Sequence, residues 1–321
     1  MALPEPEVGE FLRRRYGVGV SAVEPLAGGA WSAAYGFVLE TEPLVIRFGR
    51  YVEDFEKDRL VAGLTAELSE LPVPEVLELG PTPDGYFAVS RRAYGTFLDE
   101  LSGPAMAATL PTLFRALRSL ASIDPPGDGY GGFDGWGNAA YRSWADALLE
   151  VGVDEPGGRV SGWKRLLAAS SWGLRPFESG LRALETLAGE LPEPVPRRLV
   201  HSDLLHRNVL VRNPAPVEQG ELAAVFDWAN AMYADPVFDL AWLTYWWPWH
   251  PQWRRIDIRK AIEPELMELG PPEQVEHRLL CCLIRIGLEH IAYNAFVGDW
   301  SEVDRNTHRT LGLLRHRQGS R

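Results

Sequence analysis

Hydrophobic and polar positions divide the chain into two parts with different patterns. A short amphipathic helix is predicted at residues 7–16, and a longer one at 53–71 ends before Pro72. Short apolar runs bounded by turn residues predict strands at 20–26, 34–40, 44–48, 74–79 and 86–91. The first 95 residues therefore predict a small lobe rich in β-structure.

The rest of the chain has mainly helical periodicity. Helices are predicted at 104–123, 140–151, 174–191, 237–246, 254–269, 272–296 and 301–317, with short strands at 209–211 and 223–226. We therefore expect an α+β protein of two lobes, a small β-rich lobe over residues 1–93 and a larger, mainly helical lobe over 94–321.

The composition disfavours some classes of binding partner. The 321 residues hold 32 Lys and Arg against 44 Asp and Glu, a net charge of −12, which disfavours binding to nucleic acid or to an anionic membrane surface. The first residues lack a basic patch followed by an apolar run, and the aromatic run Leu240–Trp249 is too short to span a bilayer. We expect a cytoplasmic monomer.

One polar motif carries chemistry. His201, Asp203 and Asn208 form the pattern His-x-Asp-x-x-x-x-Asn between apolar residues, and Asp227 follows the apolar run Ala224–Phe226. Phosphoryl transfer explains this set, because one carboxylate can orient an acceptor hydroxyl and take its proton while an amide oxygen and a second carboxylate hold Mg²⁺ against phosphates. Asp203 would be that base, Asn208 and Asp227 the metal ligands, and His201 a support that bonds to the loop backbone.

Taken singly, each of these residues has an ordinary structural explanation. A loop Asp or Asn is usually a turn former, and a His beside apolar residues is usually a satisfied core residue. The combination favours a kinase. A pseudokinase that binds nucleotide without turnover is the alternative from another class, and the complete set of Asp203, Asn208 and Asp227 argues against it.

Three segments resemble the aminoglycoside phosphotransferase family, a branch of the protein-kinase-like fold. They are the catalytic motif, Phe226-Asp227-Trp228 and Ala234–Ala241, and the likeness runs from about residue 10 to about residue 305. It implies a nucleotide-binding N-terminal lobe, a catalytic and acceptor-binding C-terminal lobe, ATP as phosphate donor and Mg²⁺ as cofactor. Asp239 would cap the catalytic loop, and the hinge that meets adenine would be Arg91, Arg92 and Ala93.

The same resemblance assigns the phosphate-binding cation. Arg47 stands in the third strand where most kinases have lysine, and Asp58 occupies the place of its acidic partner. The segment Leu26–Ser32 is a weak candidate for a phosphate cradle, because its only support is its position between two strands, where a plain hairpin turn would look the same.

The resemblance also implies a cationic aminoglycoside acceptor, with hygromycin B favoured over other antibiotics. Another small alcohol, such as a macrolide, homoserine, choline or a sugar, is the alternative. Carboxylates and aromatic faces suit a polycationic sugar, and the candidates are Asp134, Trp246, Trp249 and Glu289. Core packing explains Trp246 equally well, Glu289 could face solvent, and Trp249 is expected to be exposed.

Two cationic residues fall inside the catalytic motif. His206 and Arg207 stand between Asp203 and Asn208, where a positive charge beside the base would repel a cationic acceptor unless it points at phosphate.

Overall fold

The computed structural model describes residues 4–26, 29, 31–212 and 220–318. The chain divides into two compact units. Unit 1 takes residues 1–127, 133–138 and 203–231, and unit 2 takes 128–132, 139–202 and 232–321. The lobe boundary expected after residue 93 stays a prediction.

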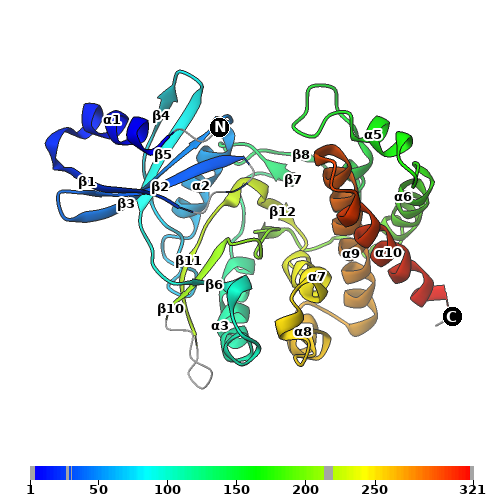
Figure 1. Ribbon diagram of the computed structural model, residues 1–321. Coiled ribbons are helices and arrows are strands. Elements are labelled where there is room, and N and C mark those ends of the chain that lie inside the picture. The colour runs from blue at the N-terminus through cyan, green and yellow to red at the C-terminus, as the bar shows by residue number, and fades with distance from the viewer. Residues whose placement is uncertain (1–3, 27–28, 30, 213–219, 319–321) are drawn as a thin grey trace. The chain divides into compact units, whose positions relative to one another are not determined.

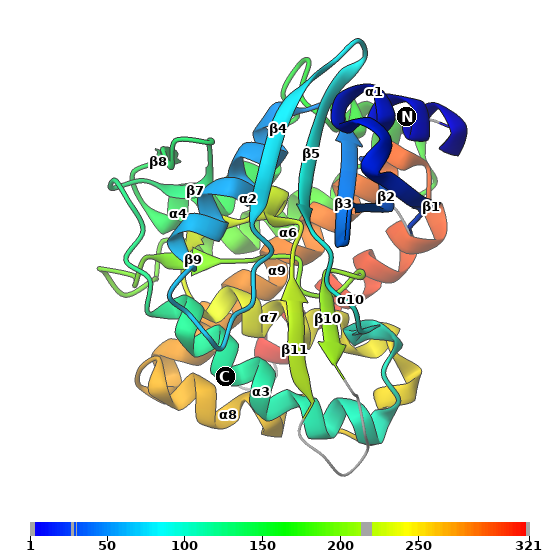
Figure 2. The same cartoon turned by 90° about the vertical axis from the view of Figure 1, so that its left-hand side faces the viewer.

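Unit 1 contains two antiparallel sheets and three α-helices among its described residues (Figures 1 and 2). The larger sheet has the strand order β1-β2-β3-β5-β4, and the smaller one has the order β11-β10-β6. The elements are α1 (Glu5–Tyr16), β1 (Val20–Pro25), β2 (Ser32–Leu39), β3 (Glu42–Gly49), α2 (Val52–Leu64), β4 (Val76–Thr82), β5 (Gly85–Arg91), β6 (Thr96–Phe97), α3 (Gly103–Ala121), β10 (Val209–Arg212) and β11 (Glu221–Val225).

Alternation along β3 separates the core of this unit from its functional face. Leu44, Ile46 and Phe48 are buried with α1 and the neighbouring strands, whereas Val45 and Arg47 between them line a cavity. Because successive strand residues point to opposite faces, one strand supplies both surfaces.

A polar cluster ties α1 to β4. Glu78 accepts hydrogen bonds from Arg15, with Nε at 2.7 Å from Oε1, and from the hydroxyl of Tyr16. The hydrogen bond from Arg15 lowers the pKa of Glu78, and burial raises the pKa of Tyr16 to about 12. The cluster links α1 to the strand at the edge of the larger sheet.

The second helix is shorter than its sequence pattern predicts. Helix α2 ends at Leu64 rather than at residue 71, and the hydroxyl of Thr65 donates to the carbonyl of Val61 at 2.8 Å. The following residues form turns, and Pro72 accepts a hydrogen bond from the amide of Val225 with its carbonyl at 2.8 Å. This segment therefore joins β11 instead of extending the helix.

Unit 2 is mainly helical, with a small sheet of order β8-β7-β12-β9 whose strand β7 ends in unit 1. Its elements are β7 (Tyr130–Phe133), β8 (Ala139–Tyr141), α4 (Trp144–Leu149), α5 (Trp163–Ala169), α6 (Arg175–Ala188), β9 (Arg198–Val200), β12 (Met232–Ala234), α7 (Val237–Trp246), α8 (Ile258–Glu268), α9 (Pro272–Val297) and α10 (Trp300–Gln318).

Several predicted boundaries in this unit are wrong for local reasons. The helix expected at 140–151 is a strand followed by α4, because the hydroxyl of Ser143 caps α4 by accepting from the amide of Asp146 at 3.1 Å. Likewise α8 begins at Ile258 rather than residue 254, capped by Asp257. Helix α5 and the short strands β6, β7, β8, β9 and β12 are absent from the sequence prediction.

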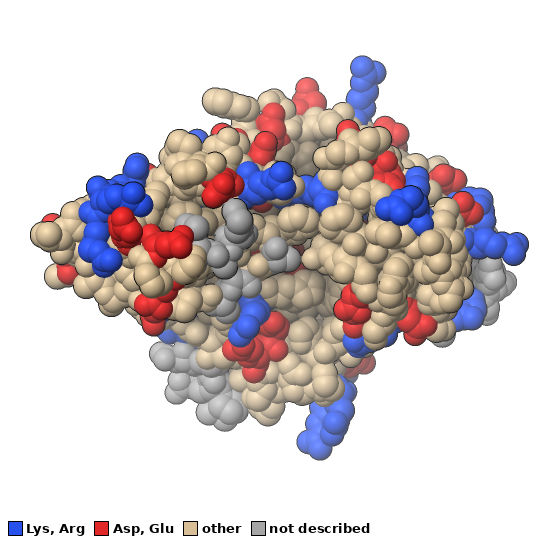
Figure 3. All heavy atoms as spheres, turned by 45° about the horizontal axis from the view of Figure 1, so that its top comes forward, with Lys and Arg blue, Asp and Glu red and all other residues tan. Residues whose placement is uncertain are grey.

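Helix α9 is the central helix of unit 2. It is long and apolar enough to cross a membrane by length and composition, but 67% of its most apolar window is buried inside the protein, as in the core helix of a globular domain. Arg278 on α9 forms a buried two-bonded ion pair with Asp235, whose carboxylate also accepts from the amide of Val237 at the start of α7. On the face drawn in Figure 3, basic and acidic side chains of the described residues are interspersed.

Candidate active site

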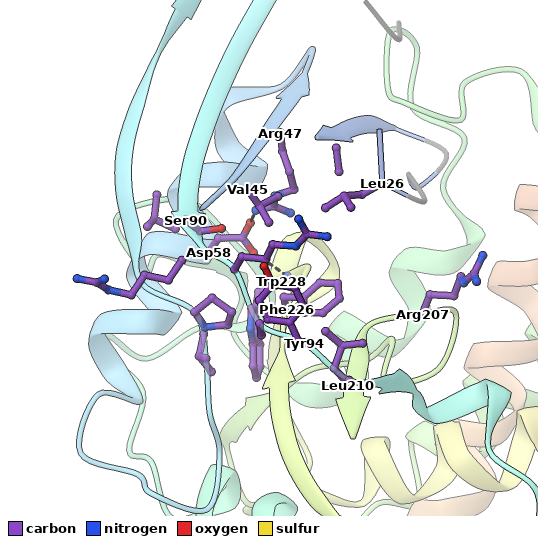
Figure 4. Close-up of a pocket in the computed structure, with 18 of the residues that line it drawn as sticks. Leu26, Val45, Arg47, Asp58, Ser90, Tyr94, Arg207, Leu210, Phe226 and Trp228 are labelled. Atoms are coloured by element: carbon purple, nitrogen blue, oxygen red, sulfur yellow. Dashed lines mark hydrogen bonds and ion pairs between the residues drawn. The ribbon is translucent and has the colours of Figure 1, made fainter. Parts of the chain in front are cut away.

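The site begins with an arginine on the cavity face of β3. Arg47 forms an ion pair with Asp58 of α2, and its side chain is 16% exposed (Figure 4). Burial alone would lower the pKa of Arg47, but the negative charges of Asp58 and Asp227 outweigh it and the pKa is raised. Arg47 therefore stays cationic.

Asp58 connects that arginine to the Asp227 segment. One carboxylate oxygen pairs with Arg47, and the other accepts a hydrogen bond from the backbone amide of Trp228 at 2.8 Å. Next to Asp58, the ammonium of Lys57 donates to the carbonyl of Ala229 at 2.8 Å. Helix α2 thus holds the backbone on the C-terminal side of Asp227.

Asp227 itself is half-buried and has a strained backbone. Its backbone has a φ of 64°, in the left-handed region that side-chain-bearing residues rarely occupy. Burial raises the pKa of its carboxyl to about 6, with Arg47 acting in the opposite direction and Asp58, Asp203 and Asp54 adding to the rise. A half-buried carboxylate with a raised pKa is suited to a cationic ligand.

Asp203 and Asn208 of the catalytic motif lie in the same unit as Asp227. Asn208 donates from Nδ2 to the backbone carbonyl of Asp203 at 2.8 Å, and Asn230 donates from Nδ2 to Asp203 Oδ2 at 3.3 Å. The ring of His206 contacts Asp203 Oδ1 through Nδ1 at 2.7 Å. Burial would lower the pKa of His206, but its hydrogen bond to Asp203 and the charge of Asp203 raise it overall.

The preceding residues are fixed by Asp239 within unit 2. The amide of His201 donates to Asp239 Oδ2 at 3.0 Å, and the amide of Ser202 donates to Oδ1 at 2.8 Å. Burial raises the pKa of Asp239, while the charge of His201 and these hydrogen bonds oppose the rise. The carboxylate at the start of α7 therefore fixes the backbone just before Asp203.

A cavity of about 280 Å³ opens beside Arg47 and Asp58. Its walls include Val45 of β3, the hinge residues and aromatic side chains, and Figure 4 shows Phe226 and Trp228 beneath it. The predicted hinge residues Arg91, Arg92 and Ala93 all line it. The guanidinium of Arg92 bonds to Glu24 at 2.6 Å and lies 4.8 Å from the ring centre of Tyr94.

The loop before β2 lies near the proposed metal ligand. A β-carbon placed on Gly29 would come within 3.9 Å of Asp227 Oδ2. The remaining glycine of the predicted phosphate cradle, Gly28, lies outside the described residues, as do Ala27 and Ala30.

Arg207 does not add a charge directly to Asp203. Its guanidinium pairs with Glu100 and lies 4.8 Å from the ring centre of Phe97, and the residue lines the cavity. Neither this pairing nor the bonds of Lys57 and Asn230 was predicted from the sequence. Lysine is rare in this chain, at Lys57, Lys164 and Lys260, and that rarity was the one available signal for Lys57.

The four acceptor candidates belong to two different units. Asp134 belongs to unit 1, where its carboxylate accepts from the amides of Trp136 and Asn138, both at 2.9 Å, and so holds its own loop. Trp246 and Trp249 pack together in unit 2 with ring centres 4.9 Å apart. Glu289, also in unit 2, pairs with Arg285 at 2.9 Å.

The expected exposure of Trp249 is wrong. The residue is half-buried, because its ring stacks on Tyr245 with centres 5.8 Å apart, Arg305 covers it, and its Nε1 donates to Glu302 at 2.8 Å. Trp246 is a core residue with 5% exposure.

The donor set fits a magnesium ion. Since Asn208 uses its Nδ2 on the Asp203 carbonyl, its Oδ1 is the side-chain atom suited to a cation, and Asp227 adds a half-buried carboxylate. These are hard oxygen donors, and Mg²⁺ completes its octahedron with waters and nucleotide phosphates rather than a full protein cage. Accordingly, no group of three or more His, Cys, Asp or Glu side chains suited to a metal occurs in the described part of the chain.

The geometry is that of a phosphotransferase of the kinase-like type, with a cation on β3, an acidic partner on the next helix and two polar loops. The model of the phosphotransferase enzyme family matches residues 22–269, and the chain belongs to this family. Its fold is the α+β, protein-kinase-like fold of the aminoglycoside phosphotransferases.

Individual relatives agree with that assignment. The chain is 29% identical over 310 residues to the hygromycin-B 4-O-kinase of Escherichia coli, covering 94% of this chain and 82% of that protein. A thermostable mutant of aminoglycoside phosphotransferase APH(4)-Ia, in a ternary complex with AMP-PNP and hygromycin B, superposes with a TM-score of 0.80 at 27% identity, covering 96% and 98% of the two chains. The GDP and kanamycin complex of another aminoglycoside phosphotransferase, APH(2″)-IIIa, shares the fold, with a TM-score of 0.65 at 12% identity over 97% and 99% of the chains.

Proposed function

We propose that this protein is an ATP- and Mg²⁺-dependent kinase that transfers the γ-phosphoryl group to a hydroxyl of an aminoglycoside antibiotic, with hygromycin B as the acceptor. The observation that carries the proposal is the convergence of Arg47, Asp58, Asp203, Asn208 and Asp227 in one unit beside a cavity lined by the hinge. Relatives whose names specify this acceptor support the choice of hygromycin B.

In this mechanism the nucleotide base enters the cavity against residues 91–93 and the phosphates extend toward Arg47. Arg47 binds phosphate oxygens while Asp58 fixes its direction. Asn208 and Asp227 hold Mg²⁺, which neutralises charge on the phosphates when bound. Asp203 orients the acceptor hydroxyl and takes its proton as the new P–O bond forms and the bond to the β-phosphate oxygen breaks.

The acceptor contacts of Asp134, Trp246, Trp249 and Glu289 are the least constrained part of the proposal. The carboxylate of Asp134 is already bonded within its loop, so its role would be to shape that loop. Glu289, with a side chain 44% exposed, remains available for a polycationic sugar, whereas the ring of Trp249 is already packed against Tyr245 and Arg305.

One assay tests the function. Purified protein with MgATP is incubated with hygromycin B, kanamycin, erythromycin, choline or homoserine, and ADP release is followed. We expect turnover with hygromycin B above that with the other acceptors. Turnover with choline, homoserine or erythromycin alone would replace the aminoglycoside assignment, and absence of turnover with the whole panel, together with intact nucleotide binding, would favour the pseudokinase.

The role of Asp203 has its own test. Asp203→Ala should abolish turnover and leave the affinity for MgAMP-PNP nearly unchanged, because the side chain acts on the acceptor. Near-normal turnover of this variant would remove Asp203 as the base.

A further inference from the structure

His206 makes a close contact to the carboxylate of the proposed base. Its Nδ1 lies 2.7 Å from Asp203 Oδ1, compared with 3.3 Å for the Asn230 contact to Oδ2. A carboxylate can only accept a hydrogen bond, so Nδ1 carries the proton in this contact. Asn208 fixes the Asp203 backbone separately, through the carbonyl. The side chain and the main chain of Asp203 are thus held by different residues.

The backbone around His206 is unusual for residues that carry a β-carbon. His206 and Arg207 have φ values of 64° and 70°, consecutive residues in the left-handed region. Such conformations cost free energy, persist only where the surroundings impose them, and concentrate at functional sites. Here the turn brings the His206 ring back to Asp203, three residues earlier.

We propose that His206 is a positioning residue, which holds the Asp203 carboxylate in the orientation that receives the acceptor proton. This inference rests on the proposed function, because it requires Asp203 to be the base. It also explains why His206 and Arg207 stand inside the catalytic motif. The ring of His206 is directed at Asp203, and the guanidinium of Arg207 is directed at Glu100. His206 makes no bond to substrate in this proposal.

Three substitutions separate positioning from maintenance of the turn. His206→Ala removes the contact. His206→Gly also removes it but suits a positive φ better than any other residue. His206→Asn keeps a donor in nearly the place of Nδ1 and tolerates the left-handed region. If the ring positions the base, the His206→Asn variant retains activity and the His206→Gly variant does not. If His206 served only to form the turn, the His206→Gly variant would be at least as active as the native chain.

The measurement is steady-state and single-turnover ADP release with hygromycin B, or with whichever acceptor of the panel is active. We expect Ala and Gly to lower kcat by about 10- to 100-fold, the scale of small misplacements of a reacting group, with Asn within about threefold of the native chain. KM for ATP and the calorimetric affinity for MgAMP-PNP should not change. His308→Ala is the matched control, because His308 contacts Asp304 at 3.4 Å on the exposed side of α10.

A double substitution gives the decisive comparison. In an Asp203→Asn background, His206→Ala should cause no further loss, because a residue that acts through another contributes nothing once that residue is disabled. The positioning role would be overturned if His206→Ala lowered the activity of the Asp203→Asn variant by the same factor as it lowers that of the native chain. It would also be overturned if His206→Asn were as impaired as His206→Ala. Near-normal turnover of Asp203→Asn alone would instead remove Asp203 as the base, and absence of turnover by the native chain with the whole acceptor panel would overturn the proposed function, so the failures are distinguishable.

Discussion

At the scale of single residues, Asp227 has a proposed role that its surroundings disfavour. Cation binding requires the ionised carboxylate, and the folded environment raises the pKa of that carboxyl. Burial raises its pKa to about 6, so the ionised form is disfavoured in the folded protein without a cation. A raised carboxyl pKa makes no difference to stability below the unfolded pKa and destabilises the fold progressively as pH rises through the folded pKa. The carboxylate that would bind the cation therefore lowers the stability of the metal-free protein at neutral and alkaline pH.

Asp227→Asn should weaken nucleotide binding and stabilise the metal-free protein. We expect the affinity for MgAMP-PNP to fall at least about tenfold at pH 8, the scale of changes near a bound metal. The metal-free variant should be more stable than the native chain at pH 8, and this gain should vanish toward pH 4. Isothermal calorimetry and urea unfolding measure the two effects. Unchanged nucleotide affinity would remove Asp227 from the metal site.

Sequence reasoning at this scale works where the chemistry lies within a short segment. Asp203 and Asn208 are five residues apart, so one loop can present both, and the pattern is visible without a structure. The contact between His206 and Asp203 depends on the left-handed backbone of residues 206 and 207, which no composition rule indicates. The carbonyl that Lys57 binds is 172 residues away, and only the fold reveals it.

At the scale of elements, close approach of helices in unit 2 depends on Gly287 of α9. A β-carbon there would lie 2.0 Å from Thr310 Oγ1 of α10 and 3.0 Å from the hydroxyl of Tyr245 of α7. Gly287→Ala should therefore destabilise the protein by about 1–3 kcal/mol through overpacking. Gly312→Ala in α10, with nothing within 4 Å of the added carbon, should be neutral or stabilising by up to about 1 kcal/mol. Urea midpoints of both variants test this, and equal midpoints would contradict the close packing.

The tie between α1 and β4 predicts a pH effect. The folded pKa of Glu78 is lowered from its ordinary 4.5, so its contribution to stability is present above that pH and is lost as pH falls through the folded pKa. Glu78→Gln should therefore be less stable than the native chain at pH 7, and the difference should shrink below about pH 4.5. Thermal unfolding from pH 3 to pH 7 checks the trend, and a difference independent of pH would show that charge is not involved.

Element prediction succeeded for long periodic segments and failed for short ones. The patterns of α9 and α10 are long enough to mark both ends of each helix within one residue. Strands such as β6 and β12 have two and three residues, and they exist because a partner strand is present. The residues of such a short strand do not indicate which distant strand it pairs with, so the strand cannot be predicted from them alone.

At the scale of the whole molecule, unit 1 is discontinuous in sequence. It joins the N-terminal 127 residues to residues 133–138 and 203–231, which include the catalytic motif from Asp203 onward. The cavity beside Arg47 is lined by residues of this unit, from Leu26 to Trp228. A boundary drawn along the chain at residue 93, as the sequence predicts, would instead separate Arg47 from Asp203. Contacts between distant segments decide between the two divisions.

Hydrogen exchange with mass spectrometry distinguishes these divisions. Because a ligand stabilises the state and the region that bind it, MgAMP-PNP should slow exchange in β3, α2 and residues 203–212 and 220–231 together, with smaller changes in the interior of α9. In mild urea without ligand, residues 203–212 should open with β3 and not with α9. The Asp227→Asn variant is the control, since its weakened nucleotide binding should reduce the protection in all unit 1 segments alike. If residues 203–212 instead open together with α9, the catalytic motif belongs to the cooperative unit of the helical lobe, and the boundary at residue 93 would describe the molecule better.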